Sequence, residues 1–301
     1  MPLLLAEAAK LSNDMVQRGV IETILEESPM LRAMPFLEIE GNSYKYNQEL
    51  ALGAAQFYAV NGTWTEAAAT FTQKTAQLAI LGGDADVDNF VQRARSDVND
   101  QRAIQTVLKA KATARKWEQT VINGSATTDP NSFDGLKTLL PSVSGGSSQV
   151  LAPAAAGGAL TLVLLDQLID MVLGGKPDAL LMSKRTRRKL KALLAASAHY
   201  VEDGSSMFGA QTMMYDGIPV LVSDFILDTE AADDTTGTTF SSIYAIHFGA
   251  ADGLVGLTNG GIEVIDIGPL ETKDAQRVRV RWYVGMAALR LSAIARMIGV
   301  S

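Results

Sequence analysis

The spacing of hydrophobic residues changes near position 36, and this change separates the beginning of the chain from its remainder. Residues 3–28 carry apolar side chains at helical spacing, with a break around the run Ser12-Asn13-Asp14. They predict an amphipathic helix that ends at Ser28-Pro29, because the residue before a proline is pushed out of the helical region. Since the chain builds its core only later, we expect this helix to dock on another surface, its own or a partner's.

Residues 37–81 indicate a long, two-armed β excursion. Polar and apolar positions alternate with the period of a strand in three segments: 37–40, 44–47 and 66–80. Between them, residues 50–62 are rich in Ala and Gly and end in the turn pair Asn61-Gly62. Two arms of ~15 residues at ~3.3 Å each would span about 50 Å, and a lone hairpin is marginal in water. We therefore predict that a neighbouring molecule buries the aromatic residues of the tip: Phe57, Tyr58 and Trp64.

A drifting helical stripe of apolar residues begins at Val87 and predicts one long helix to about Asn123. At 1.5 Å per residue, ~35 residues form a rod of about 50 Å. Either Asp86 or Asp88 is expected to be its N-cap, since negative charge suits that end of the helix dipole. The Asp84-x-Asp-x-Asp pattern also resembles the start of an EF-hand loop. That interpretation is disfavoured, because such a loop needs Gly at its sixth position and a bidentate Glu at its twelfth.

The second half of the chain predicts an α/β segment behind a Ser/Gly-rich connection at 141–158. A helix is expected at 160–173, a buried strand at 179–182, and a second helix from the N-cap Ser183 to about Ala196. Further strands are expected at these positions: 219–222, 243–248, 254–257, 262–267, 277–282 and an apolar strand over 286–298.

Composition limits the kind of protein this can be. The chain has 301 residues, of which 47% are hydrophobic and 20% charged, which is ordinary for a globular protein of one large or two intimate domains. It has no cysteine, so disulfides and thiolate metal sites are impossible. No apolar run approaches the ~20 residues of a membrane-spanning helix. A net charge of -7 argues against a nucleic-acid clamp, although such a chain can still surround nucleic acid.

Candidate catalytic patterns are weak. The segment from Ile80 to Asp84 lacks the G-x-G-x-x-G spacing of a dinucleotide site, and neither a P-loop nor a G-x-S-x-G motif occurs. The two histidines, His199 and His247, are not grouped in the sequence with a nucleophile or a carboxylate pair. We therefore expect no catalytic, cofactor-binding or metal site, and a protein that is not an enzyme.

Two groups of basic residues allow a specific interpretation. The run 184–191 is placed at a helix N-terminus, where the dipole disfavours cations, so we expect acidic groups of the same or an adjacent subunit to approach it, in preference to DNA. Arg187 and Arg188 are its predicted subunit contacts. The second group alternates along one strand face, which is either solvated or a charged subunit seam held by forked guanidinium groups: Arg277, Arg279 and Arg281.

With these residues in place, the chain resembles the major capsid proteins of tailed bacteriophages with the Hong Kong 97-like fold. The resemblance runs through nearly the whole length and is one of pattern and order. It is carried by these stretches: Val20-Ile21-Glu22 to Ser28-Pro29, the run from Leu37 to Asn47, Asp216-Gly217-Ile218-Pro219-Val220, residues 243–249 and residues 281–298.

The resemblance implies an α+β fold in four parts. These are an N-terminal arm (1–35), an extended β-hairpin E-loop (36–83), a peripheral domain with a spine helix (84–149 and about 266–284), and an α/β axial domain (150–265 and about 285–301). It implies self-assembly as hexamers and pentamers, with procapsid maturation, into an icosahedral head that encloses double-stranded DNA through non-specific contacts. It also implies a portal protein, no cofactor, no membrane, and a virion assembled in the host cytoplasm, and it leaves open whether a decoration protein binds.

The chain departs from the family pattern at two places. The arm begins within a few residues of Met1, so a separate scaffolding protein is expected. The tip, 50–63, lacks the lysine through which some relatives crosslink their subunits. Two other hypotheses stay open: an encapsulin-type compartment of the same fold that holds cargo enzyme, and a soluble α/β enzyme with an unusual β arm.

Overall fold

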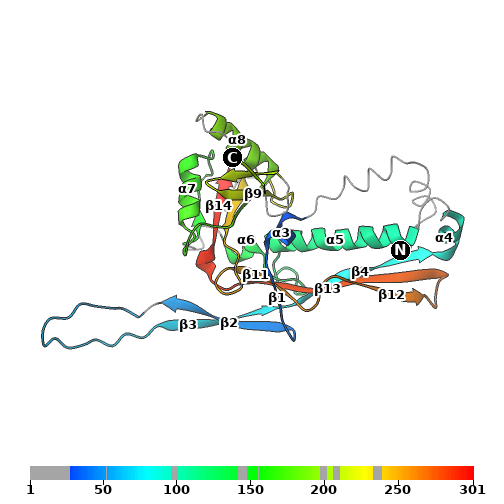
Figure 1. The fold of residues 1–301 in the computed structure, drawn as a ribbon, viewed down its shortest axis with the longest axis horizontal. Helices are drawn as coiled ribbons and strands as arrows, with labels where there is room; N and C mark the ends of the chain where they lie inside the picture. Colours follow the sequence, from blue (N-terminus) through cyan, green and yellow to red (C-terminus); the bar gives the residue numbers. More distant parts are fainter. Residues whose placement is uncertain are drawn as a thin grey trace.

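The structure is a computed structural model. The residues it describes are 28–51, 53–95, 101–141, 148–154, 156–196, 202–205, 211–232 and 239–301. The helix expected at 3–28 lies outside these residues except for Ser28, which is the N-cap of the short helix α3 (Pro29–Ala33). The described elements form two sheets and a projecting hairpin, and the long helix α5 (Gln101–Asn123) runs along one of the sheets (Figure 1).

The two-armed β excursion is confirmed. Strands β2 (Ser43–Ala51) and β3 (Thr70–Gln77) pair antiparallel, with Tyr44 opposite Ala76. The ladder is shorter than the alternation suggested, and the intervening chain continues as an open loop that projects far from the rest of the molecule (Figure 1). Asn61 has a φ of 64°, as expected for its place in the Asn-Gly turn.

A five-stranded sheet lies beside the base of the hairpin. It consists of β1 (Phe36–Glu38), β11 (Leu254–Thr258), β13 (Ala275–Ala288), β12 (Glu263–Pro269) and β4 (Ala79–Asp88). The division of the chain proposed from sequence placed β1 in the hairpin and β11 in the axial domain, whereas both are hydrogen-bonded in this sheet. Its longest strand, β13, pairs with β4 over ten positions, from Ala275 opposite Asp88 to Val284 opposite Ala79.

Strand β4 corrects the predicted start of the long helix. Residues up to Asp88 are strand, and helix α4 (Asn89–Arg95) comes next, with α5 beginning at Gln101. Asp88 is the cap, since its Oδ1 accepts hydrogen bonds from the amides of Phe90 (2.7 Å) and Val91 (3.4 Å). The helical spacing after Val87 therefore predicted helix correctly, but the carboxylates that precede it, Asp84 and Asp86, belong to strand β4.

Helix α5 packs on one face of this sheet through aromatic side chains. Trp117 of α5, Phe36 and Trp282 of β13 form a triangle with all three ring centroids 5.7 Å apart, and Trp117 is completely buried. Two glycines of β4 lie in close contacts: Gly82 against the backbone of β13, and Gly83 against the mobile end of a lysine side chain on α5. A Cβ on Gly82 would collide with the carbonyl oxygen of Val280, and one on Gly83 with the side chain of Lys109.

The second sheet has seven strands. In spatial order they are β5 (Val150–Leu151), β14 (Ile294–Val300), β10 (Ser241–Ile246), β6 (Ala179–Met182), β9 (Ile218–Val222), β8 (Gln211–Tyr215) and β7 (Glu202–Ser205). The expected helices are confirmed as α7 (Leu162–Asp170) and α8 (Lys184–Ala196). The apolar strand expected over 286–298 is wrong, because β13 ends at Ala288 and a 3-10 turn (Leu291–Ala293) leads into β14 in the other sheet.

Side-chain alternation explains how both faces of the second sheet are covered. Leu180 and Met182 point toward α7 and α8, whereas Leu181 points toward α3, α5 and α6 (Leu136–Leu139). The core around Leu181 also includes Trp282 and Val284 of the first sheet. The two sheets are therefore joined by one continuous hydrophobic core.

A buried ion pair crosses this core. Arg296 of β14 is 0% exposed, and its Nη2 lies 3.4 Å from Oε2 of Glu230, which also accepts a short hydrogen bond from Ser242. The guanidinium donates to the carbonyl oxygen of Leu140 (3.0 Å) and lies over the ring of Tyr244. Each of these partners stabilises a charge that would otherwise be costly to remove from water.

The alternating arginines of β13 form a ladder with carboxylates of the same chain. Arg277 is bidentate to Asp86 (2.7 Å for both bonds), and Arg279 is bidentate to Asp84 (2.7 and 2.8 Å). The third pair joins Arg281 to Glu263 at 2.7 Å. Asp84 and Asp86 are thus not helix-cap charges, as the sequence suggested, but residues of β4 directly opposite their partners. The hydrogen bonds from Arg279 and Arg277 hold the pKa values of these carboxyl groups below their usual range.

The ladder predicts how stability responds to acid. A depressed pKa in the folded state contributes stability that is fully present above the unfolded pKa of ~3.9 and is lost as the pH falls through the folded value. We expect Asp84→Asn/Asp86→Asn to lower the Tm at pH 7, and the difference to shrink as the pH falls below about 4. Thermal melts of the unassembled subunit across the acid range test this. The control is Glu66→Gln/Glu271→Gln, which makes the same charge change at exposed positions. A deficit that is equally large at both ends of the pH range contradicts the prediction.

The buried ion pair predicts a non-additive pair of substitutions. Arg296→Met leaves the Glu230 carboxylate buried without its cation and should cost about 3–5 kcal/mol in the free energy of unfolding. Arg296→Met/Glu230→Leu removes both charges and should recover part of that loss. Urea denaturation of the unassembled subunit measures the free energies of the double variant and of both single variants. A double variant that loses as much free energy of unfolding as the two single variants together would show that the pair is not coupled in this way.

Candidate assembly surfaces

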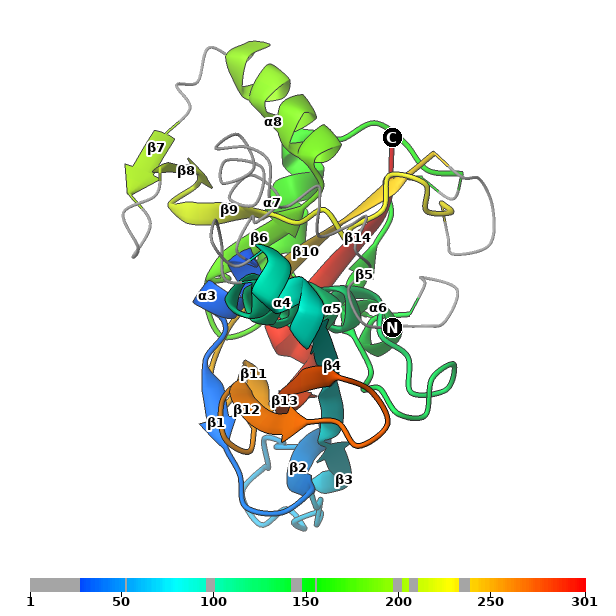
Figure 2. The same ribbon diagram turned by 90° about the vertical axis from the view of Figure 1, so that its right-hand side faces the viewer.

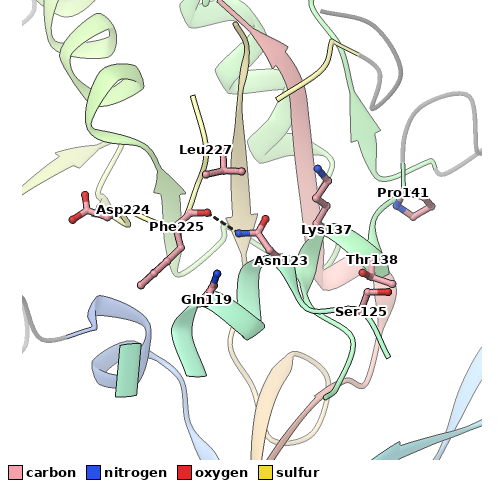
Figure 3. A pocket seen from close by; sticks show the side chains of 9 residues that line it. All are labelled: Gln119, Asn123, Ser125, Lys137, Thr138, Pro141, Asp224, Phe225 and Leu227. Carbon is pink, nitrogen blue, oxygen red and sulfur yellow. Dashed lines mark hydrogen bonds between the residues drawn. The ribbon is translucent and has the colours of Figure 1, made fainter. Parts of the chain in front are cut away.

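One open hollow of about 760 Å³ lies where the end of α5, helix α6 and the loop after β9 meet (Figure 3). It is lined by Gln119, Asn123, Ser125, Lys137, Thr138, Pro141, Asp224, Phe225 and Leu227. Asn123 spans part of it by donating a hydrogen bond to the carbonyl oxygen of Phe225 (2.7 Å). The lining is mixed, with the apolar side chains of Pro141, Phe225 and Leu227 beside polar and charged ones. Within the described parts of the chain, no cluster of acidic or histidine residues is arranged to hold a metal ion.

His247 is grouped with two carboxylates, which its sequence position did not reveal. Its Nδ1 is 2.7 Å from Oδ2 of Asp178, and its Nε2 is 3.6 Å from Oδ1 of Asp252. Asp178 also accepts the backbone amide of Phe248 (2.7 Å). These contacts tie the end of β10 to two loops. His199, the other histidine, lies outside the described residues.

The hairpin tip carries large apolar side chains with no core beneath them. Phe57 is fully exposed and Trp64 is 80% exposed. Tyr58 stacks on Trp64 with ring centroids 4.3 Å apart, and its hydroxyl oxygen accepts the amide of Thr65 (3.0 Å). The tip therefore has local order but is not buried against any part of the chain that the structure describes. Exposed aromatic clusters of this kind mark interaction sites.

The basic run on α8 is divided by the structure. Lys184 pairs with Asp224 (2.8 Å) and Arg185 with Asp228 (3.3 Å), so acidic groups of the same subunit approach the first two cations, as predicted. Asp228 also accepts a hydrogen bond from the cap residue Ser183 (2.6 Å). Arg187 and Arg188, further along the helix, are solvent-exposed. Whether they contact another subunit stays a prediction.

The arginine ladder changes the basis of the predicted subunit seam. The forks of Arg277 and Arg279 are already occupied by carboxylates of their own chain. A contact between this strand face and a neighbouring subunit therefore stays a prediction. It can no longer rest on unpaired guanidinium groups, because those of Arg277 and Arg279 are paired within the chain. The hairpin side of the sheet also presents Ile80, which is 79% exposed.

Within the described residues, no helix has the length and apolar character to cross a membrane.

Comparison with solved structures shows the fold. The chain is similar to the holo-SrpI encapsulin of Synechococcus elongatus PCC 7942, with a TM-score of 0.71, 18% identity, and coverage of 100% of this chain and 97% of the other. It is similar to the capsid of a native GTA particle, with a TM-score of 0.70, 16% identity, and coverage of 92% and 91%. Microbacterium phage Oxtober96 gives a TM-score of 0.65, 14% identity, and coverage of 100% and 99%. The α+β, Hong Kong 97-like fold is thereby confirmed.

Sequence comparison identifies the family. No curated protein matches the chain. The SU10 major capsid protein family matches residues 10–234, which is most of its length. This range includes the projecting hairpin, α5 and the basic helix α8, whereas β10 to β14 lie beyond it and are covered by the structural likeness. The chain therefore belongs to the SU10 major capsid protein family and is a structural capsid protein.

Proposed function

We propose that this capsid protein assembles as hexamers and pentamers into the icosahedral head of a tailed phage, where it encloses double-stranded DNA. The observation that carries this proposal is the projecting hairpin, whose aromatic tip is not buried by any of the described residues of its own subunit. Because exposed apolar surface costs free energy in water at roughly 25 cal/mol per Å², the tip is stabilised by packing on a neighbouring copy. Phe57, Tyr58 and Trp64 are the proposed contacts.

The division drawn from the sequence needs two changes, because β1 and β11 belong to the five-stranded sheet. In the proposed division, the extended loop comprises the β2–β3 hairpin, the peripheral domain the five-stranded sheet with α5, and the axial domain the seven-stranded sheet with α7 and α8. The N-terminal arm is proposed to span residues 1–35, of which the structure describes those from Ser28 onward. A separate scaffolding protein, a portal protein and a decoration protein are proposed partners, and assembly is proposed to take place in the host cytoplasm.

An encapsulin-type compartment is the second candidate, because the likeness to the holo-SrpI encapsulin covers the whole chain. The family match favours the phage head. The absorbance ratio of purified native particles at 260 and 280 nm separates the two. Heads filled with DNA give the absorbance ratio typical of nucleic acid, whereas a shell filled with enzyme gives the ratio typical of protein.

The tip predicts a separation of folding from assembly. Phe57→Ser/Trp64→Ser should leave the unfolding free energy of the subunit within about 0.5 kcal/mol of the parent, because both side chains are exposed there. The same variant should fail to form closed shells in electron micrographs, as should a deletion of residues 50–63. Phe57→Tyr/Trp64→Tyr keeps aromatic surface at the same positions and should still assemble. Closed particles of normal yield from the serine variant would end the proposal for the tip.

The lack of crosslinking chemistry predicts a shell held by non-covalent contacts. The tip residues 50–63 contain no lysine and the chain contains no cysteine. Mature particles boiled in detergent should therefore run as a single band near 32.0 kDa. The matched control is the same particle treated with a lysine-reactive crosslinker, which should give a ladder. A ladder without the reagent would contradict the prediction.

A further inference from the structure

Three cations form a stripe along the solvent-facing side of α8. Arg187 and Lys191 lie one helical turn apart, about 6 Å along the axis, and Arg188 lies beside them. All three side chains are exposed, whereas Thr186, Leu190 and Leu194 are buried on the opposite side of the helix. Figure 2 shows α8 at the outer end of the axial domain, away from α5 and the five-stranded sheet.

This stripe is electrostatically unfavourable within the isolated subunit. Like charges one turn apart on a helix repel each other, and Arg187 lies in the first turn of α8, near the positive end of the helix dipole. Lys184 and Arg185 are compensated by Asp224 and Asp228, but the stripe has no acidic partner among the described residues. Such a concentration of cations in a chain of net charge -7 calls for an anion from outside the subunit.

Among the side chains that the structure describes, the axial domain of a second copy has little acidic surface left to supply that anion. Its described carboxylates are mostly engaged within their own subunit: Asp166 with Tyr215, Asp178 and Asp252 with His247, Asp216 with Lys176, and Glu230 with Arg296. Asp170 is exposed and has no partner among the described residues, and the side chains of Glu202 and Asp203 on β7 lie outside the description. Among the described side chains, one free carboxylate does not balance three cations.

We propose that Arg187, Arg188 and Lys191 bind the phosphate backbone of the double-stranded DNA inside the head. The inference rests on the proposed function, because only a shell that encloses DNA presents this anion. Duplex DNA carries one negative charge per ~1.7 Å of its axis, so several phosphates lie within reach of a stripe one helical turn long. Guanidinium groups hold phosphates through paired hydrogen bonds, and such contacts do not depend on base sequence. This partner replaces the neighbouring subunit that the sequence suggested for Arg187 and Arg188.

The test measures binding of a fluorescent duplex of about 30 base pairs and random sequence to the purified, unassembled full-length chain as a function of NaCl concentration. Each phosphate contact contributes about 0.9 to the slope of log K against log[salt]. Arg187→Gln/Arg188→Gln/Lys191→Gln should therefore reduce the slope by about 2 to 3. Each single substitution should reduce it by about 1, so the conclusion does not depend on the folding of the triple variant. The control, Lys45→Gln/Lys74→Gln/Lys116→Gln, removes the same charge from exposed lysines elsewhere and should leave the slope unchanged.

Three results would overturn the inference. In the first, the α8 variant gives the same slope of log K against log[salt] as the parent. In the second, the control variant loses as much slope as the α8 variant, which shows that the effect is one of net charge. The α8 variant can also fail to assemble while its duplex binding is unchanged, which assigns the stripe to a neighbouring subunit. Because the assay uses unassembled chains, it is independent of whether the protein forms a phage head. If the particle proves to be a cargo shell, the proposed function is contradicted. The result of the duplex-binding measurement is unaffected by that outcome.

Discussion

The pairing of β13 with β4 is the contact on which the other parts of this subunit depend. β4 is the chain that returns from the projecting hairpin, and its ten paired positions fix the base of that hairpin to the longest strand of the molecule. On one face of the pair, two bidentate arginine–aspartate contacts hold the register. On the other face, Trp282 packs against α5. A one-residue slip would exchange these faces, burying the charges and exposing the tryptophan, so the register is strongly specified.

The same strand also connects the two sheets. After Ala288, the chain makes one 3-10 turn and enters the other sheet as β14, beside β10. The core that surrounds this passage is shared, and the buried Arg296 sits within it, with bonds to β10, to the end of α6 and to Glu230. A buried ion pair contributes little net stability. Its several fixed partners do restrict how β14 can lie in the sheet.

Against this closed interior, two surfaces are left incomplete by the subunit. The hairpin tip presents aromatic side chains that no described core covers, and α8 presents three cations, Arg187, Arg188 and Lys191, that no described carboxylate approaches. The hairpin tip is complemented by an apolar surface and the cations of α8 by negative charge, so the two surfaces suit different partners. The proposed partners are a second copy for the hairpin tip and the enclosed DNA for α8. Each weak contact gains importance because it is repeated in every subunit of a shell.

Local pattern was sufficient for most of the elements, because their signals lie within a few residues of one another. The strand at Ala179–Met182, the cap at Ser183 and the helix to Ala196 are predicted by alternation, capping chemistry and helical spacing alone. The hairpin and its Asn61-Gly62 turn were equally predictable. The resemblance of order over the whole chain then indicated the fold and the family.

Only the tertiary structure decided where the charges go. Asp84 and Asp86 precede a helix and carry the sign of cap residues, yet their partners are 195 and 191 positions away on β13. Asp178 binds the amide of Phe248 across 70 residues, and the break between β13 and β14 is set by the change from one sheet to the other. Local periodicity reports which face of an element is apolar. It carries no information about which distant strand lies alongside, and a side-chain charge acquires its role only from that neighbour.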